Sequence, residues 1–383
     1  MAGLYIHIPF CKNRCIYCGF YSTTLNGMKH CYVDALCKEM LLRSEELGDV
    51  DSTVTTIYLG GGTPSQLSIE QLQKIFLYIY KVYSVAADAE ITMECNPDDV
   101  TKEYALSLQD LPINRISMGA QTFSDDRLKF LHRRHTSKQV TEAVENLRKT
   151  GVKNISVDLM FGFPEETLQE WTTDIKHCQA LDVEHISAYS LMYEEGTRLY
   201  EMACGSKSAI KPVHEETSLE MYEKLIDMLE NSGYEHYEIS NFARCGFRSI
   251  HNGNYWNGTP YTGLGAAAHS YDRFSRRWNV SDVRKYIDTL EKGILPVEEV
   301  ETLDVDMQYD DVVVTALRTR EGIDIETVDA KFGNDYKRYL IDSAGQYIKS
   351  GMLAISNGRL FLTRRGLFIS DTIMSDLMHP SDS

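Results

Sequence analysis

The chain has 383 residues, of which 43% are hydrophobic, and a formal net charge of −17. This length allows one large domain and a smaller one, and the acidic balance disfavours a protein that grips a nucleic-acid backbone. Nine cysteines, scattered along so long a chain, disfavour a secreted disulfide scaffold. Because residues 1–20 lack a signal-peptide pattern and no long apolar run follows, we expect a cytoplasmic protein without a membrane span.

Three cysteines follow the first apolar segment, Leu4–Ile8, in the pattern C-x3-C-x2-C: Cys11, Cys15 and Cys18. No fourth cysteine or histidine follows at a similarly short spacing. Thiolates are the ligands that iron–sulfur clusters require, whereas a structural zinc site takes four protein ligands. The spacing favours a [4Fe–4S] cluster with one iron left free. A zinc knuckle and part of a disulfide framework are the alternatives.

Short apolar or β-branched runs alternate with segments of helical spacing in the first part of the chain. The predicted strands are Leu4–Ile8, Thr56–Leu59, Glu90–Glu94, Arg115–Met118, Ile155–Met160, His185–Leu191 and, more weakly, His236–Ile239. The predicted helices cover Tyr32–Met40, Val140–Leu147, Leu168–Cys178 and Leu219–Leu229. This alternation predicts an α/β fold with a parallel sheet. Too few units are present for a closed (β/α)8 barrel, so we predict a partial (β/α)6 TIM-type barrel whose working residues lie at the C-terminal strand ends.

The rest of the chain predicts two further parts. A Gly- and aromatic-rich stretch, His251–Tyr271, precedes a helix at Ser281–Lys292. From Thr302 the pattern predicts helices and then a hairpin around Asn357-Gly358, formed by Met352–Ser356 and Arg359–Thr363. This order resembles a winged helix, for which the acidic balance favours a packing or lid role over DNA binding. We predict a barrel at 1–240, a connecting segment at 241–300 and a C-terminal winged-helix-like α+β domain at 301–383.

Two motifs follow predicted strands directly. Gly60-Gly61-Gly62-Thr63-Pro64 comes after the second strand, and its glycines would let a ligand approach the backbone. Such turns are nevertheless common in α/β proteins. Glu94 ends the third strand, where a carboxylate can accept hydrogen bonds from a ribose or an amino group, or be a solvated loop charge.

Two polar residues belong to the next strands. Gln121 stands just past the fourth strand, and Asp158 lies within the fifth. An aspartate inside an apolar strand is costly to bury unpaired, so it needs a ligand or a charged partner. Arg133 or Arg134 could supply that charge.

These motifs together resemble the radical S-adenosylmethionine proteins, and within them the group that contains oxygen-independent coproporphyrinogen III oxidase (HemN) and the heme chaperone HemW. The matching stretches are Tyr5-Ile6-His7-Ile8-Pro9-Phe10-Cys11, the cysteine triplet, GGGTP, Glu94-x-x-Pro97, Gly119-x-Gln121 and Asp158-Leu159-x-x-Gly162-x-Pro164. The resemblance covers nearly the whole chain.

The resemblance implies roles for individual residues. Cys11, Cys15 and Cys18 would hold the cluster, whose fourth iron is chelated by the amino and carboxylate groups of S-adenosylmethionine. That molecule would be seated by Tyr5, Gly61 and Glu94, with Tyr17 beside the cluster. HemN binds a second S-adenosylmethionine, and its contacts correspond to Gly62, Thr63, Gln121, Arg133 and Asp158.

Three features favour the HemW branch. HemN has a further cysteine where this chain has Phe20, and a longer segment before its cluster. His251-Asn252-Gly253-Asn254-Tyr255-Trp256 matches the HNxxYW motif of HemW. Histidine is a standard axial ligand of heme iron, and Tyr255 and Trp256 offer flat faces to a macrocycle. We therefore predict that His251, Tyr255 and Trp256 bind heme, although a histidine beside aromatics is ordinarily a satisfied core residue.

The implied function is heme binding and delivery to apo-hemoproteins, for example those of a respiratory chain. A low-potential electron donor would serve the cluster, which would gate transfer or support a redox step. A homodimer and peripheral membrane docking are both compatible with this function, and a nucleic-acid partner is not expected. The alternatives are the HemN reaction, oxidative decarboxylation of coproporphyrinogen III, and a structural zinc protein with an acidic interaction tail.

Three secondary expectations concern other residues. His269 lies in a small-residue loop and is expected to be structural. Gly19 departs from relatives, which usually carry an acidic residue after the last cluster cysteine. The remaining cysteines are expected to be buried small hydrophobes: Cys31, Cys37, Cys95, Cys178, Cys204 and Cys245.

Overall fold

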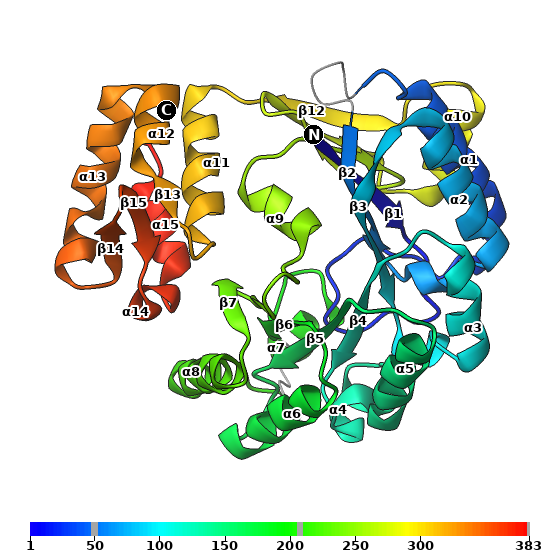
Figure 1. Cartoon of the computed structure of the whole chain (residues 1–383), viewed down its shortest axis with the longest axis horizontal. Helices are drawn as coiled ribbons and strands as arrows, with labels where there is room; N and C mark the ends of the chain where they lie inside the picture. Colours follow the sequence, from blue (N-terminus) through cyan, green and yellow to red (C-terminus); the bar gives the residue numbers. More distant parts are fainter. Residues whose placement is uncertain (47–52, 205–209, 381–383) are drawn as a thin grey trace.

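The computed structural model describes residues 1–46, 53–204 and 210–380. Within these residues one sheet of twelve strands curves through most of the chain (Figure 1). Its central strands are β1 (Ala2–Ile8), β2 (Thr53–Gly61), β3 (Ser84–Cys95), β4 (Arg115–Gln121), β5 (Ile155–Phe161) and β6 (His185–Ser190). Each pairs in parallel with the next. The predicted partial barrel of six parallel strands is confirmed.

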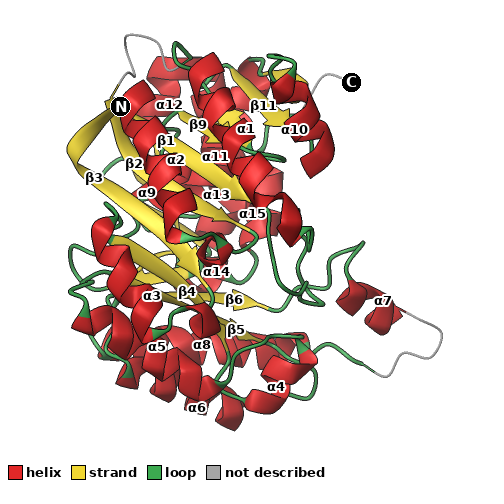
Figure 2. Cartoon of the chain, turned by 90° about the vertical axis from the view of Figure 1, so that its right-hand side faces the viewer, coloured by secondary structure: helices red, strands yellow, loops and turns green. Residues whose placement is uncertain are grey.

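Helices cover the outer face of these strands (Figure 2). They are α1 (Lys29–Leu42), α2 (Ile69–Val82), α3 (Lys102–Ser107), α4 (Asp125–Phe130), α5 (Ser137–Lys149), α6 (Leu168–Ala180) and α8 (Glu215–Asn231). Helix α7 (Arg198–Cys204) stands apart from them in Figure 2. Helix α5 begins after Thr136, which forms a capping box with Gln139. No helix in the described ranges is long and apolar enough to cross a lipid bilayer.

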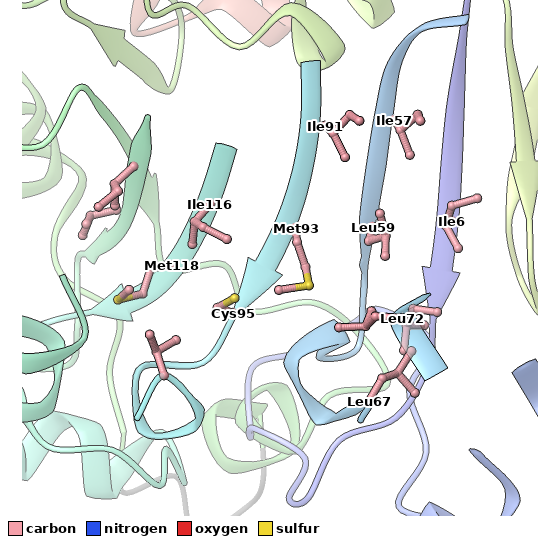
Figure 3. Close-up of a cluster of buried hydrophobic side chains, with 14 of the residues drawn as sticks. Ile6, Ile57, Leu59, Leu67, Leu72, Ile91, Met93, Cys95, Ile116 and Met118 are labelled. Carbon is pink, nitrogen blue, oxygen red and sulfur yellow. The ribbon is translucent and has the colours of Figure 1, made fainter. Parts of the chain in front are cut away.

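Apolar and polar side chains alternate along the strands, so that one face of the sheet is apolar and the other is polar. Apolar side chains of every second residue point toward the helices and form the main core, including Ile6, Ile57, Leu59, Ile91, Met93, Cys95, Ile116 and Met118 (Figure 3). The intervening positions hold polar residues, among them Tyr5, Tyr58, Glu94, Ser117 and Asp158. Since successive strand residues face opposite sides, these polar groups share the inner face of the barrel.

Both edges of the sheet are extended by residues from 235 onward. One edge gains β8 (Asn241–Ala243) and β7 (Glu235–Glu238), and the other gains β9 (Tyr261–Leu264), β10 (His269–Tyr271), β11 (Ser275–Asn279) and β12 (Val297–Thr302). Strand β9 pairs in parallel with β1. Residues 241–300 are therefore more than the connecting segment that we predicted, because they complete the sheet on both sides.

A buried carboxylate joins the β9–β12 extension to α1. Glu39 is 0% exposed and accepts hydrogen bonds from Tyr286 Oη (2.6 Å), Asn279 Nδ2 (2.7 Å) and the Gly265 amide (2.8 Å). Arg43, also buried, donates to the same carboxylate at 2.8 Å. Tyr286 belongs to α10 (Val283–Glu291), which matches the helix predicted at Ser281–Lys292.

The C-terminal part has its own small sheet and core. Its elements are α11 (Val305–Leu317), β13 (Ile323–Asp324), α12 (Ile325–Phe332), α13 (Asn334–Lys349), β14 (Leu353–Ser356), β15 (Arg359–Leu362), α14 (Arg364–Leu367) and α15 (Ser370–Leu377). The predicted hairpin is present, with Asn357 and Gly358 both at positive φ. Buried residues such as Tyr309, Leu340 and Leu360 form a cluster separate from the barrel core. The helix–hairpin order agrees with the winged-helix-like prediction.

Candidate functional site

A cavity of about 640 Å³ opens at the C-terminal ends of the parallel strands. All twelve residues predicted for the cluster and S-adenosylmethionine line it: Tyr5, Cys11, Cys15, Tyr17, Cys18, Gly61, Gly62, Thr63, Glu94, Gln121, Arg133 and Asp158. They come from five different strands and the loops that follow them. The topology brings them together because the carboxyl ends of parallel strands meet at one edge.

The three cysteines lie on the loop after β1 and face this cavity half-buried. Cys11 Sγ lies 3.5 Å from Thr63 Oγ1, and Arg133 Nη1 donates to Cys15 Sγ at 3.7 Å. Burial raises the pKa of the Cys18 thiol to about 11 and also raises the pKa of Cys11. The thiols of Cys11 and Cys18 are thus protonated at neutral pH until a metal displaces the protons.

Two carboxylates stand on the inner face of the barrel behind the cysteine loop. Glu94 accepts hydrogen bonds from Tyr58 Oη at 2.8 Å and from the Gly61 amide at 3.1 Å. Burial nevertheless raises the Glu94 pKa to about 7, and burial likewise raises the Asp158 pKa to about 6. Both carboxyls are poised to gain from a cationic ligand, since such a ligand would offset the cost of burying their charge.

Of the two arginines predicted as charged partners of Asp158, Arg133 does lower its pKa, while Arg134 pairs elsewhere. Arg134 pairs with Asp98 (2.8 Å) and Asp99 (3.2 Å), away from Asp158. Ser117 Oγ lies 3.4 Å from Asp158 Oδ1. The positive charge that lowers the Asp158 pKa most is that of Arg115, a buried residue on the inner face of β4, with Arg133 second.

Arg133 lines the cavity, and other contacts hold its guanidinium group. Its Nη2 donates to Asn96 Oδ1 and to the Gly119 carbonyl, each at 2.6 Å, while Nη1 faces Cys15. Sequence reasoning missed Tyr58, Asn96 and Arg115. The alternation of inward and outward positions along β2 and β4 would have placed Tyr58 and Arg115 on the polar face.

The backbone of the cavity wall requires glycine and carries strain. Gly61 has φ of +106°, and a Cβ on Gly62 would lie 2.7 Å from the Pro9 carbonyl carbon. Gln121 also has a positive φ, +67°, where the pairing of β4 with β5 shifts register. Non-glycine residues at positive φ are concentrated at functional sites, so the outlier at Gln121 supports its assignment to this site.

A second cavity, of about 820 Å³, lies between the barrel and the C-terminal part. The helix α9 (Ile250–Trp256), formed by the HNxxYW stretch, lies between β2 and α11 (Figure 1). Tyr255 and Trp256 line this cavity, and the guanidinium of Arg318 stacks over the Trp256 ring at 5.1 Å. The motif therefore adjoins both cavities, since Asn252 lines that of the cysteines.

His251 lines neither cavity. It is 1% exposed, with Nδ1 2.9 Å from Thr56 Oγ1 and Nε2 3.0 Å from Tyr255 Oη. Its ring stacks on Tyr58 with 5.1 Å between centroids. Both ring nitrogens thus have partners, which is the ordinary state of a buried core histidine.

The N-terminus of α9 is held by a residue that the sequence did not single out. Glu90, 5% exposed on β3, accepts hydrogen bonds from the amides of His251 (2.8 Å) and Ile250 (3.0 Å). A carboxylate at a helix N-terminus is favoured by the helix dipole and by the unpaired amides there. Glu90 therefore positions the HNxxYW segment against the barrel.

We expect Glu90→Ala to weaken the attachment of α9 to the barrel, because it leaves the amides of Ile250 and His251 without their acceptor. The loss should lower the free energy of unfolding by about 2 kcal/mol, measured by urea denaturation. Hydrogen exchange of the Ile250 and His251 amides should accelerate. Asp88→Ala, which removes an exposed carboxylate from the same strand, is the control and should change neither quantity. Unchanged protection of α9 in Glu90→Ala would contradict the positioning role.

Comparison with known proteins agrees with this arrangement. The model of the radical S-adenosylmethionine superfamily matches residues 5–178, and that of the HemN C-terminal domain matches residues 303–369. Heme chaperone HemW of Bacillus subtilis (strain 168) is 35% identical over 375 residues, which are 97% of this chain and 98% of that protein. The chain belongs to the HemW family of radical S-adenosylmethionine proteins.

Other HemW proteins match over much of their length. Heme chaperone HemW of Lactococcus lactis is 32% identical and covers 98% of this chain and 96% of its own. HemW of Escherichia coli (strain K12) is 36% identical over 269 residues, 70% of this chain and 69% of its own. The solved structure of coproporphyrinogen III oxidase (HemN) from Escherichia coli superposes with a TM-score of 0.85 at 20% identity, covering 98% of this chain and 90% of that one. At this identity the likeness shows the shared fold.

Membership of the radical S-adenosylmethionine superfamily implies a [4Fe–4S] cluster and S-adenosylmethionine. The cysteine loop fits a cluster better than a lone ion. In the described ranges no three histidine, cysteine or carboxylate side chains converge as one metal ion would require. A cluster makes no such demand, because each thiolate binds a different iron atom. The half-buried sulfur atoms on one cavity wall are therefore the donor set that this HemW-family chain offers.

Several smaller expectations for this HemW-family chain can be checked directly. Cys37, Cys95 and Cys178 are buried as expected, but Cys31, Cys204 and Cys245 are exposed. The prediction failed for these three because sequence spacing did not reveal that they lie on solvent-facing positions. His269 begins β10 and stacks on Trp278 in the strand ladder, which agrees with the structural role expected of it.

Gly19 lies beside the carboxylate of Glu194, an exposed side chain from the segment after β6. Both residues line the cysteine cavity, as does Phe20, which is 72% exposed at its mouth. In this member of the HemW family a carboxylate thus reaches the position beside the cluster loop from a different part of the chain.

Proposed function

We propose that this chain is a heme chaperone, which binds heme beside α9 and passes it to acceptor hemoproteins. The observation that carries the proposal is the second cavity, which lacks the cysteines and is lined by Tyr255 and Trp256 of the HNxxYW segment, whereas Asn252 of the same segment lines the cysteine cavity. A second site apart from the cluster suits a protein that holds a cargo. The naming of HemW relatives as heme chaperones over nearly the full length of the chain supports the same function.

In this proposal the first cavity holds the resident cofactors. Cys11, Cys15 and Cys18 hold the [4Fe–4S] cluster, and S-adenosylmethionine contacts Tyr5, Gly61 and Glu94, with Tyr17 beside the cluster. A second molecule of S-adenosylmethionine would contact Gly62, Thr63, Gln121, Arg133 and Asp158. When bound, the cluster supplies an electron at low potential. The chain's own part is to position the ligands and exclude water.

Individual groups in the cavity have definite tasks in such a complex. The Glu94 carboxylate would accept hydrogen bonds from S-adenosylmethionine, and Tyr58 and the Gly61 amide orient it. Arg133 places its positive charge beside Cys15, with Nη1 3.7 Å from the sulfur atom. The strained Gln121 backbone directs its side chain to the inner face.

The function is tested by adding ferric heme to anaerobically reconstituted protein and then offering apomyoglobin as acceptor. We expect saturable one-to-one binding, followed by appearance of the myoglobin spectrum. Absence of heme binding by the wild type would refute the chaperone function. The same preparation with S-adenosylmethionine, a reductant and coproporphyrinogen III should yield no protoporphyrinogen. Clear turnover would assign the chain to the HemN reaction instead.

A further inference from the structure

The buried position of His251 raises the question of which residue reaches the heme iron. Its Nε2 atom is hydrogen-bonded to Tyr255 Oη at 3.0 Å, and its Nδ1 atom is hydrogen-bonded to Thr56 Oγ1 at 2.9 Å. The ring is further held against Tyr58. For the imidazole to bind iron, it would have to abandon Tyr255 and leave a site in which it is 1% exposed.

Tyr255, unlike His251, does line the 820 Å³ cavity and is half-buried, and its hydroxyl group is hydrogen-bonded to His251 Nε2. Tyrosine oxygen is an established axial ligand of ferric heme. Metal ligands are commonly oriented by a hydrogen bond to a second residue, and His251 makes such a bond to Tyr255. The pair therefore has the arrangement of a ligand and its support.

The lining of the cavity suits a flat anionic ligand. Five aromatic side chains contribute to it: Tyr237, Tyr255, Trp256, Tyr261 and Tyr271. The cationic residues of the lining are Arg248, Arg273, Arg276, Lys331 and Arg359. Arg248 is ion-paired with Glu235 and Glu321, Arg276 with Glu301 and Asp311, and Arg359 with Asp324. Each guanidinium carries several N–H donors, which suit the carboxylates of a heme, while the aromatic faces suit the macrocycle.

We propose that Tyr255 is the axial ligand of the heme iron in this cavity and that His251 is its positioning residue. The proposal rests on the proposed heme-binding function and specifies its site. One bond forms, between ferric iron and the Tyr255 oxygen, and the phenol O–H bond breaks. The proton is released to solvent, and no electron is transferred. Arginines of the lining, contributed partly by the C-terminal part of the chain, would donate hydrogen bonds to the heme carboxylates.

The test compares ferric protoporphyrin with iron-free protoporphyrin as probes of the cluster-loaded protein. The wild type should bind both, and its ferric complex should show phenolate-to-iron charge transfer and phenolate modes in resonance Raman spectra. Tyr255→Phe should lose these signals and weaken ferric heme at least about tenfold, while iron-free porphyrin binds as before, because only the iron ligand is removed. Tyr80→Phe, a matched change at an exposed tyrosine on α2 that lines neither cavity, should leave every signal unchanged.

The His251→Gln variant tests the positioning residue separately from the iron ligand. It should retain the phenolate signals and weaken ferric heme by about 10-fold to 100-fold, as loss of a supporting residue does. Wild-type ferric heme showing imidazole ligation that vanishes in His251→Gln, with Tyr255→Phe unaffected, would overturn the Tyr255 assignment and leave the chaperone function standing. Failure of the wild type to bind either porphyrin would refute the proposed function itself. Equal iron-free porphyrin binding in all variants shows that they are folded.

Discussion

Replacing Cys15 by serine is expected to abolish the iron–sulfur cluster. After anaerobic reconstitution the wild type should contain about four iron and four sulfide per chain, and the variant close to none. Each of the three thiolates binds a different iron, so no remaining cysteine can substitute for the one removed. Cys15 is also the thiol that faces Arg133, so its replacement leaves that buried guanidinium without its sulfur partner.

Two control substitutions test whether loss of the cluster is specific to Cys15. Cys31→Ser and Cys245→Ser alter exposed thiols that lie outside the cysteine cavity, and both should retain the cluster. The measurements are iron and sulfide analysis together with the visible absorption of the cluster. Full cluster content in Cys15→Ser, or zinc without iron in the wild type, would show that the cysteine triplet is not a cluster site.

The second large effect is expected from Glu39→Ala. Its carboxylate is buried and receives four hydrogen bonds, one of them from the buried Arg43. Removing one partner of a buried ion pair leaves an uncompensated charge, which typically costs about 3–5 kcal/mol. The Gly265 amide and Tyr286 hydroxyl would lose their acceptor as well. We therefore expect a comparable loss in the free energy of unfolding, measured by urea denaturation.

The position of Glu39 predicts which part of the fold the substitution destabilises most. Its partners Gly265, Asn279 and Tyr286 belong to the β9–β12 extension and α10, whereas Glu39 itself belongs to α1. Hydrogen exchange in β9 and β11 should therefore accelerate more than in β4 and β5. Glu45→Ala, at an exposed carboxylate just after α1, should be neutral. Equal destabilisation by both substitutions would contradict the role of Glu39 as the link.

The barrel and its cofactor cavity could be predicted because their signals are local. Three cysteines within eight residues show their spacing directly, and apolar runs such as Leu4–Ile8 reveal strands from a few consecutive residues. The rule that working residues follow parallel strands then placed Gly61, Glu94 and Asp158 in one cavity. All the residues predicted for that cavity do line it, although their contacts with cofactors stay proposals.

The environment of His251 could not be predicted, because its partner Thr56 lies 195 positions away in the sequence. The same holds for Arg115, whose charge acts on Asp158 from a neighbouring strand. The short strands β9 and β10 have four and three residues, too few to show alternation before they pair. These features depend on which strands become neighbours.

By itself, then, the sequence determined the cluster motif, the parallel strands and the family resemblance, because each depends on residues close together in the chain. Only the tertiary structure decided that the HNxxYW segment adjoins a separate cavity and that Tyr255, rather than His251, lines it. The physical reason is that a histidine's role follows from which polar groups meet its two nitrogens. Those groups are brought to it by the packing of α9 against β2 and β3, which no local pattern encodes.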